Sequence, residues 1–120
     1  MITSDKRRPA TSKDGVLEAG KGKYRVWLKI EKLDAGVVCI LGGGERSHVG
    51  GCVIAEPGKK PKVLDVEGHY DVQVLLPIAE AACRKYNMPA AALGGVHIDK
   101  ATESEIQILV ANCEELAKCI

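Results

Sequence analysis

The chain has 120 residues, the length of a single domain. Hydrophobic residues make up 46% of it and charged residues 28%, which is typical of a globular protein and excludes a disordered one. The formal net charge of +1 gives no support for a nucleic-acid-binding or membrane-surface protein. No apolar run approaches the length of a membrane span.

The first 20 residues are rich in Lys, Arg, Ser and Thr and show little periodicity. They predict a flexible basic arm, residues 1–20, followed by one α+β domain over residues 21–120. No secretory signal follows Met1, and the five cysteines form no C-x-x-C pair. We therefore expect buried or partly buried free thiols and a cytoplasmic location.

Four strands are expected in the first half. Residues 22–33 alternate apolar and polar side chains, which predicts a half-buried strand with Trp27 on its polar face. The continuous apolar run 37–41 predicts a central strand buried on both faces. A short glycine-rich loop separates this run from the third strand, 49–55, so these two strands are predicted to pair as an antiparallel hairpin. Residues 62–66 are expected to form the fourth strand.

Two helices and a fifth strand follow. A helix is expected to end near Asn87, and Pro77 predicts that its regular part begins only near Leu76. Residues 90–98, rich in Ala and Gly, predict the fifth strand. The last helix begins at a capping box, Thr102-Glu103-Ser104-Glu105. Its apolar stripe is Ile106, Leu109, Val110, Cys113, Leu116, Ala117 and Ile120.

The element order ββββαβα predicts a two-layer α+β sandwich: a mixed, mostly antiparallel sheet with two helices on one face. The first four strands would form a meander. The second face then lacks a cover, although its central strand is apolar on both sides. We therefore expect a homodimer that buries this face.

Each of the three histidines, His48, His69 and His97, lies near glycine beside the end of an expected strand. A meander followed by a right-handed crossover places all three at one edge of the sheet, with Asp71, Asp99 and the N-termini of both helices. Helix N-termini suit an anion such as phosphate. The candidate binding residues are Gly43, Gly44, His48, Gly50, His69, Asp71, Gly95, His97 and Asp99. Taken singly, a histidine is more often structural, the aspartates fit turns, and the glycines fit tight backbone geometry.

Three motifs resemble the LpdD-like family, the small D subunits of gallate- and protocatechuate-type decarboxylases. They are Leu41-Gly42-Gly43-Gly44 with His48-Val49-Gly50, then Gly68-His69-x-Asp71, then Gly95-Val96-His97-Ile98-Asp99 ahead of Ala101-Thr102. The similarity extends from about Glu18 to the C-terminus. The chain departs from the family pattern at Ser47, where Pro is common, and at Tyr70, where Lys is common.

The resemblance implies a non-catalytic chaperone for prenylated FMN, with FMN as an alternative occupant, and a fold like that of proteasome assembly chaperones. The protein would hold the cofactor between a UbiX-type prenyltransferase and a UbiD-type decarboxylase. Trp27 is a candidate wall for the flavin ring if a second subunit brings it near.

Two other functions remain open from the residues alone. One is a small metal-dependent enzyme that uses the three histidines and an aspartate, since imidazole and carboxylate are competent zinc or iron ligands. The other is a cofactor-free assembly factor, which would bind a partner protein through the uncovered sheet face.

Overall fold

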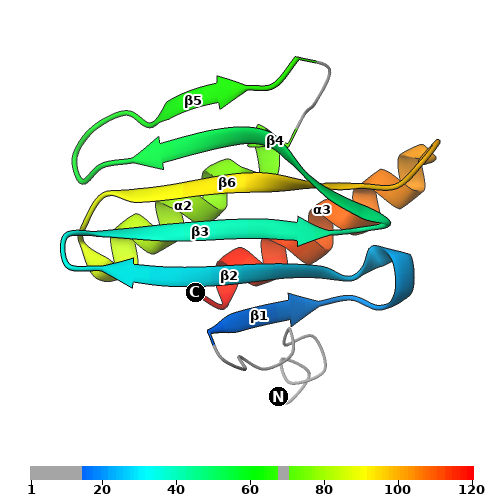
Figure 1. The fold of residues 1–120 in the computed structure, drawn as a ribbon, viewed down its shortest axis with the longest axis horizontal. Helices are drawn as coiled ribbons and strands as arrows, with labels where there is room; N and C mark the ends of the chain where they lie inside the picture. Colours follow the sequence, from blue (N-terminus) through cyan, green and yellow to red (C-terminus); the bar gives the residue numbers. More distant parts are fainter. Residues whose placement is uncertain (1–14, 68–70) are drawn as a thin grey trace.

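The structure is a computed structural model that describes residues 15–67 and 71–120 (Figure 1). The strands are β1 (Val16–Ala19), β2 (Val26–Leu33), β3 (Gly36–Gly43), β4 (Arg46–Ala55), β5 (Lys62–Asp65) and β6 (Ala90–His97). The helices are α2 (Val72–Tyr86) and α3 (Glu103–Lys118), and a short 3-10 turn, η1 (Gly22–Tyr24), precedes β2. In these two described ranges no helix is long and apolar enough to cross a membrane.

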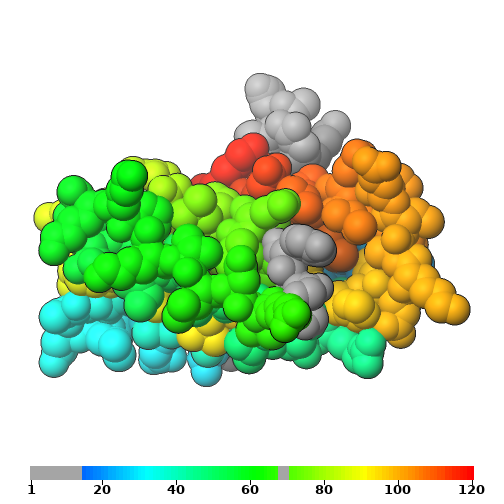
Figure 2. Space-filling view, turned by 90° about the horizontal axis from the view of Figure 1, so that it is seen from above, coloured from blue at the N-terminus to red at the C-terminus, as the bar shows by residue number. Residues whose placement is uncertain are grey.

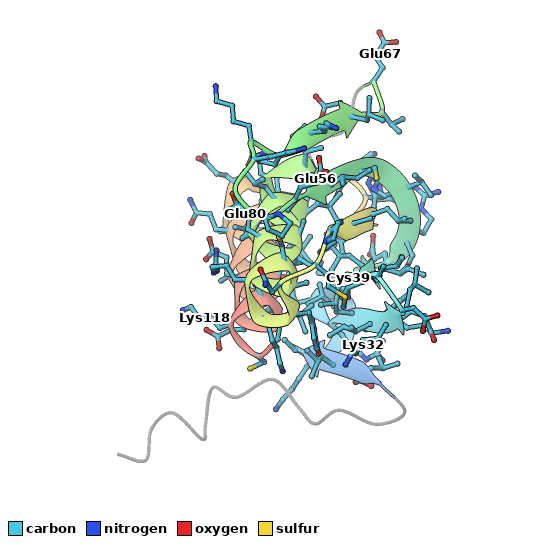
Figure 3. All side chains as sticks on the ribbon, turned by 90° about the vertical axis from the view of Figure 1, so that its left-hand side faces the viewer. Lys32, Cys39, Glu56, Glu67, Glu80 and Lys118 are labelled. Carbon is cyan, nitrogen blue, oxygen red and sulfur yellow. The ribbon has the colours of Figure 1, made fainter. Side chains whose placement is uncertain are left out.

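The six strands form one mixed sheet in the order β1-β2-β3-β6-β4-β5, in which only the β3–β6 pair is parallel. Helix α2 packs on β3, β4 and β6, and α3 packs on β1 and β2. Both helices lie on the same side of the sheet, so the molecule has two layers (Figures 2 and 3). The α+β sandwich expected from the sequence is confirmed.

The predicted pairing of β3 with β4 is wrong, because β6 lies between them. The two strands still run in opposite directions, since β6 is parallel to β3 and antiparallel to β4. The glycines of β6 allow this insertion. Gly94 has a φ of 120°, and a Cβ atom there would collide with the carbonyl oxygen of Leu41. A close backbone approach of this kind is open only to glycine.

The segment 16–19, expected within the flexible arm, instead forms β1 and pairs antiparallel with β2. Leu17 and Ala19 are buried on the side of the sheet that carries α3. Burial of these two side chains stabilises an edge strand whose four residues are too few for a periodic signal. Residues 1–14 of the predicted arm lie outside the described residues.

Helix α2 begins at Val72, so the start near Leu76 predicted from Pro77 is also wrong. The carbonyl oxygen of Asp71 accepts hydrogen bonds from the backbone N–H groups of Val74 and Leu75, which closes the first turn. Proline removes one helical hydrogen bond. Six side chains of α2 are buried, and this burial outweighs the loss.

The start of α3 agrees with the sequence. Thr102 Oγ1 accepts from the backbone N–H of Glu105, and Glu105 Oε1 accepts from the backbone N–H of Thr102. The same carboxylate contacts Lys23 Nζ at 2.6 Å and accepts from the Tyr24 hydroxyl at 3.2 Å. Glu105 therefore joins the N-terminus of α3 to the segment that precedes β2.

These contacts predict an acid-sensitive link. Hydrogen bonding to Lys23, then to the backbone of Thr102, lowers the pKa of Glu105 from 4.5 to about 2. A lowered carboxyl pKa contributes stability that is present above pH 4.5 and is lost as the pH falls towards 2. Glu105→Gln should therefore lower the melting temperature more at pH 6 than at roughly pH 2.5. Thermal unfolding followed by circular dichroism would check this, with Glu114→Gln on the exposed side of α3 as control. An equal decrease at both pH values would contradict it.

Candidate functional site

Two histidine–aspartate pairs lie at the edge of the sheet where β3 and β6 end. His48 Nε2 is 2.9 Å from Asp71 Oδ2, and His97 Nε2 is 2.9 Å from Asp99 Oδ1. The two imidazole rings are close neighbours, with 5.8 Å between their centroids. The structure thus brings together His48, His97 and the two aspartates. His69 lies outside the described residues.

An irregularity in β4 positions the first pair. Ser47 pairs with Val96 and Gly51 with Gly94, so three residues of β4 lie opposite one residue of β6. At this bulge the backbone N–H of Val96 donates to Asp71 Oδ1 at 3.0 Å. Bulges commonly redirect a side chain next to a functional site. Asp71 directly precedes α2 and is only 9% exposed. Because its carboxylate contacts Val96 of β6 and His48 of β4, it connects the helix layer to the sheet.

Two glycines make room for this buried pair. A Cβ atom on Gly95 would lie 2.5 Å from the His48 ring and 2.7 Å from Asp71 Cγ, and one on Gly50 would lie 2.7 Å from Asp71 Cγ. Such distances are far below van der Waals contact, so a side chain at either position would displace the pair. Both candidate glycines therefore have a steric reason to be glycine.

Gly43 and Gly44 have a different environment. A Cβ atom on Gly43 would collide with the backbone of β2, and one on Gly44 would lie 2.9 Å from the backbone nitrogen of His97. Their positive φ values, 133° and 74°, suit the tight turn between β3 and β4. We expected Gly43, Gly44 and Gly50 to line a pocket beside the histidines, and none of them lines the cavity found there.

The second pair is more exposed and more highly charged. Arg46 Nη2 donates to Asp99 Oδ1 at 2.7 Å, and the backbone N–H of Asp99 donates to Glu45 Oε1 at 2.8 Å. The hydrogen bond from His97, followed by the charge of Arg46, lowers the pKa of Asp99. Asp99 is therefore ionised at neutral pH and fixes the orientation of the His97 ring.

A cavity of about 350 Å³, here called the histidine cavity, opens between this edge of the sheet and the two helices. Its polar lining consists of His48, Asp71, Gln73, His97 and Lys100. Its apolar walls include Val96, Ile98, Ile106, Leu109 and Val110. Lys100 has a φ of 50°, an uncommon backbone conformation for a residue with a side chain. The cavity thus combines a polar side, which carries the ammonium group of Lys100, with apolar walls.

The residues Gln73 and Lys100, and the part of α3 that lines the cavity, were not among the sequence candidates. Ile106 and Val110 were assigned to the core stripe of α3. Val110 is partly buried, but Ile106 is 49% exposed, because part of the stripe faces the cavity. The apolar stripe of α3 thus indicated the residues that form the α3 wall of the cavity, although it did not indicate the cavity itself. Nothing in the sequence distinguished Lys100 from other exposed lysines.

The helix N-termini serve the site less than expected. In the first turn of α3, the backbone N–H of Glu105 donates to Thr102. Glu103 and Glu105 also place negative charge there, which disfavours an external anion. At α2, Asp71 itself occupies the position before the helix. Any anion in the cavity would therefore depend on the side chains of Lys100 and the histidines.

The thiols offer no nucleophile at this site. Cys113 lines the histidine cavity, and burial raises its pKa to about 12, so the thiol is protonated at neutral pH. Burial also raises the pKa of Cys39 to about 11. None of the five cysteines forms a disulfide with another, as expected, although Cys119 is exposed rather than buried.

A metal centre built on the three histidines would need His69. Among the residues in the ranges 15–67 and 71–120, no three His, Cys, Asp or Glu side chains are grouped to hold a metal ion. Trp27, the candidate flavin wall, packs over Gly42 on the sheet face without helices. It therefore does not line the histidine cavity of its own chain.

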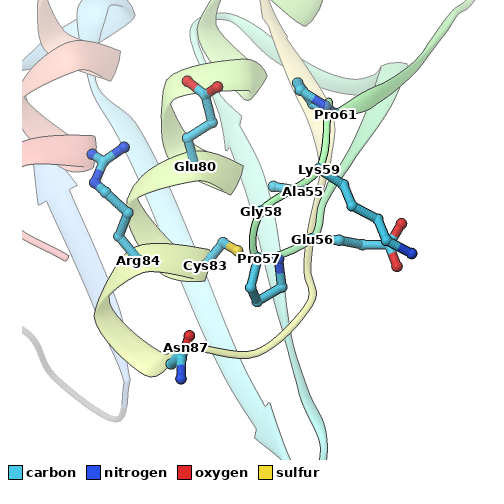
Figure 4. A pocket seen from close by; sticks show the side chains of 10 residues that line it. All are labelled: Ala55, Glu56, Pro57, Gly58, Lys59, Pro61, Glu80, Cys83, Arg84 and Asn87. Carbon is cyan, nitrogen blue, oxygen red and sulfur yellow. The ribbon is translucent and has the colours of Figure 1, made fainter.

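A larger cavity of about 540 Å³ lies at the opposite end of the sheet, between the β4–β5 loop and the C-terminal half of α2 (Figure 4). Pro57, Cys83, Arg84 and Asn87 are among the residues that line it. Its charged residues are of both signs and it contains no histidine. We assign the functional site to the smaller histidine cavity, because His48 with its partner Asp71, His97 and Lys100 all line it.

Comparison with known proteins identifies the fold and the family. A solved structure described as a novel chaperone complex for yeast 20S proteasome assembly has a similar fold, with a TM-score of 0.50 at 12% sequence identity. The alignment covers 88% of this chain and 97% of that one. No curated protein matches the sequence. The family model for the prenylated flavin chaperone LpdD-like domain matches residues 20–120. The chain therefore belongs to the prenylated flavin chaperone LpdD-like family.

Proposed function

We propose that this protein binds prenylated FMN in the histidine cavity, receives it from a UbiX-type prenyltransferase and delivers it to a UbiD-type aromatic acid decarboxylase. The observation that carries the proposal is the composition of the cavity. Two imidazoles and the ammonium group of Lys100 lie beside apolar walls in one space of about 350 Å³. A flavin nucleotide combines a phosphate with a large fused ring, so it has one group for the polar side of the cavity and one for its apolar walls.

The donor set fits both parts of the cofactor. Lys100 is suited to a phosphate, to which its ammonium group would donate charge-assisted hydrogen bonds. Ile98, Ile106 and Val110 are suited to the flavin ring. Small-molecule sites range from about 300 to 1,000 Å³, so this cavity is near the lower limit. Part of the cofactor would remain accessible, which suits a protein that passes it on.

We infer a holding role rather than catalysis. The family to which the chain belongs is described as a prenylated flavin chaperone, and the Cys113 thiol at the cavity is protonated. We therefore assign His48 and His97, which each contact a carboxylate, to orienting and retaining the ligand. Decarboxylation belongs to the cofactor once it is bound in the partner enzyme. We further propose that the protein acts in the cytoplasm, where its free thiols remain reduced, and that it acts as a homodimer.

A comparison of FMN with riboflavin tests the roles of the two sides of the cavity. Lys100→Ala should weaken FMN binding roughly tenfold, because it removes a charge-assisted contact to phosphate. It should leave the binding of riboflavin, which lacks the phosphate, unchanged. Val110→Trp, which fills the apolar side, should weaken both ligands. Quenching of flavin fluorescence in a titration measures each dissociation constant.

Lys118→Ala, on the exposed end of α3, is the matched control and should bind both ligands as the unmodified protein does. Equal weakening of FMN and riboflavin by Lys100→Ala would show that Lys100 does not contact the phosphate. Unchanged binding in both Lys100→Ala and Val110→Trp would place the flavin outside the histidine cavity.

A further inference from the structure

The sheet face that carries no helix, here called the open face, has an ordered pattern of side chains across five strands. In one register row, β5 to β2 contribute Lys62, Ile54, Ala91, Val38 and Glu31 in spatial order. The adjacent row contributes Leu64, Cys52, Leu93, Ile40 and Lys29 in the same order. Residues paired across strands point to the same side of a sheet, so each row forms a continuous line on this face.

These rows are apolar in the middle and charged at their ends. Leu64 is 70% exposed and Ile54 is 38% exposed, whereas the alternate residues Val53 and Cys39 on the helix side are fully buried. Within the described part of the chain, no helix covers the open face (Figure 3). An apolar surface of this extent, with charges at its borders, is typical of an interface.

The first row is complementary to itself about β6. A twofold axis along β6 in the plane of the interface reverses the strand order in the second copy and keeps each row opposite its own counterpart. Ala91 then faces Ala91 of the second copy, Ile54 faces Val38, and Lys62 faces Glu31. The strands of the two sheets are aligned, which is a common geometry for stacked sheets.

The adjacent row satisfies the same symmetry. Leu93 faces its own counterpart on the axis, and Cys52 faces Ile40. Leu64, the most exposed large apolar side chain of the two rows, faces Lys29, whose aliphatic stem can cover it while the ammonium group stays in water. In neither row does a charged side chain face one of the same sign in the second copy. The one apolar side chain that faces a lysine, Leu64, contacts its aliphatic stem rather than its ammonium group.

We propose that the open face binds a second copy of this chain through a twofold axis along β6, with two Glu31–Lys62 ion pairs across the interface. Both side chains are available for this contact. Glu31 is exposed, and Lys62 is 74% exposed. Lys62 lies 3.3 Å from Glu56 of its own chain, but an exposed ion pair of this kind contributes little and can exchange partners. The inference rests on the homodimer proposed above and specifies its interface, but it does not depend on the cofactor.

Charge reversal tests the pairing. Glu31→Lys alone places two Lys–Lys contacts in the dimer, and Lys62→Glu alone places two Glu–Glu contacts there. Each variant should raise the dimer dissociation constant at least about tenfold. In a mixture of the two variants, every cross-subunit pair is again Lys with Glu, so a heterodimer should form with an affinity close to that of the unmodified protein. Sedimentation velocity over a dilution series measures the dissociation constant of each single variant and of their mixture.

Glu114→Lys and Lys118→Glu are matched controls on the exposed side of α3 and should leave the dimer unchanged. Circular dichroism spectra should show that all variants are folded. If the unmodified protein were monomeric at micromolar concentration, the proposal would be overturned, and the open face would instead bind a different protein. Single variants that dimerise like the controls, or a mixture that stays monomeric, would overturn the proposed register.

Discussion

Leu109→Ala should lower the free energy of unfolding by about 2–5 kcal/mol, the range for truncation of a buried leucine. Leu109 is 6% exposed and lies at the middle of the buried face of α3, where Cys113 and Leu116 continue the contact with the rest of the core. Truncation would both expose the neighbouring side chains and enlarge the histidine cavity, which Leu109 lines. Urea denaturation followed by circular dichroism gives the change.

Glu114→Ala is the matched control for this experiment. Glu114 lies on the exposed side of the same helix, so its truncation should change the free energy of unfolding by no more than about 0.5 kcal/mol. Both substitutions introduce alanine into the same helix, which removes helix propensity as an explanation for a difference. Equal denaturation midpoints would contradict the assignment of the buried face of α3.

Asp71→Ala should lower the free energy of unfolding by about 1–3 kcal/mol, the cost of leaving a buried polar group without its partner. The carboxylate accepts a hydrogen bond from the Val96 backbone N–H and contacts His48 Nε2, so its removal affects both the β4 bulge and the imidazole. The His48 ring would then lose the contact with this carboxylate at the cavity. We therefore expect flavin binding to weaken at least about tenfold as well.

The second His–Asp pair supplies the control for Asp71. Asp99 also holds a histidine, but its side chain is 63% exposed, so Asp99→Ala should change the free energy of unfolding by no more than about 1 kcal/mol. Chemical denaturation and flavin titration of both variants would separate the two pairs. If Asp99→Ala were as destabilising as Asp71→Ala, the structural role assigned to the buried pair would be wrong.

Local signals in the sequence predicted most of the elements. The capping box at Thr102 and the apolar stripe of α3 depend on residues three or four positions apart, and the alternation in β2 depends on neighbours. Such patterns are set by the backbone geometry of the element itself. Five strands and two helices could therefore be predicted in their correct order.

The sheet order could not be predicted in the same way. A short loop between two apolar runs favours a hairpin, and no local signal shows that β6, almost 50 residues further along the chain, is inserted between β3 and β4. The glycines of β6 did indicate a close contact, but not its partner. Strand β1 was missed because its four residues are stabilised by pairing and burial rather than by a pattern of their own.

The same limit applies to the site. In the sequence, Asp71 belongs to the same short motif as His69. In the structure, the carboxylate of Asp71 contacts His48, which lies 23 residues earlier in the chain, at the bulge in β4. The sequence placed His97 and Asp99 at the same edge of the sheet, and the structure shows that these two near neighbours in the chain also form a pair. Lys100 gave no signal because its contribution depends on the helix that packs beside it. The edge of the sheet was predictable from strand directions, while the lining of the cavity was not.

The most direct test of the proposed function is the cofactor that the protein retains when it is produced together with a UbiX-type prenyltransferase. The purified protein should show a flavin absorption band, and mass spectrometry should identify prenylated FMN. Val110→Trp, which fills the histidine cavity, should abolish the band, and Glu80→Trp in the larger cavity should preserve it. A protein that carries no flavin, or Val110→Trp protein that retains as much prenylated FMN as Glu80→Trp protein, would contradict binding in the histidine cavity.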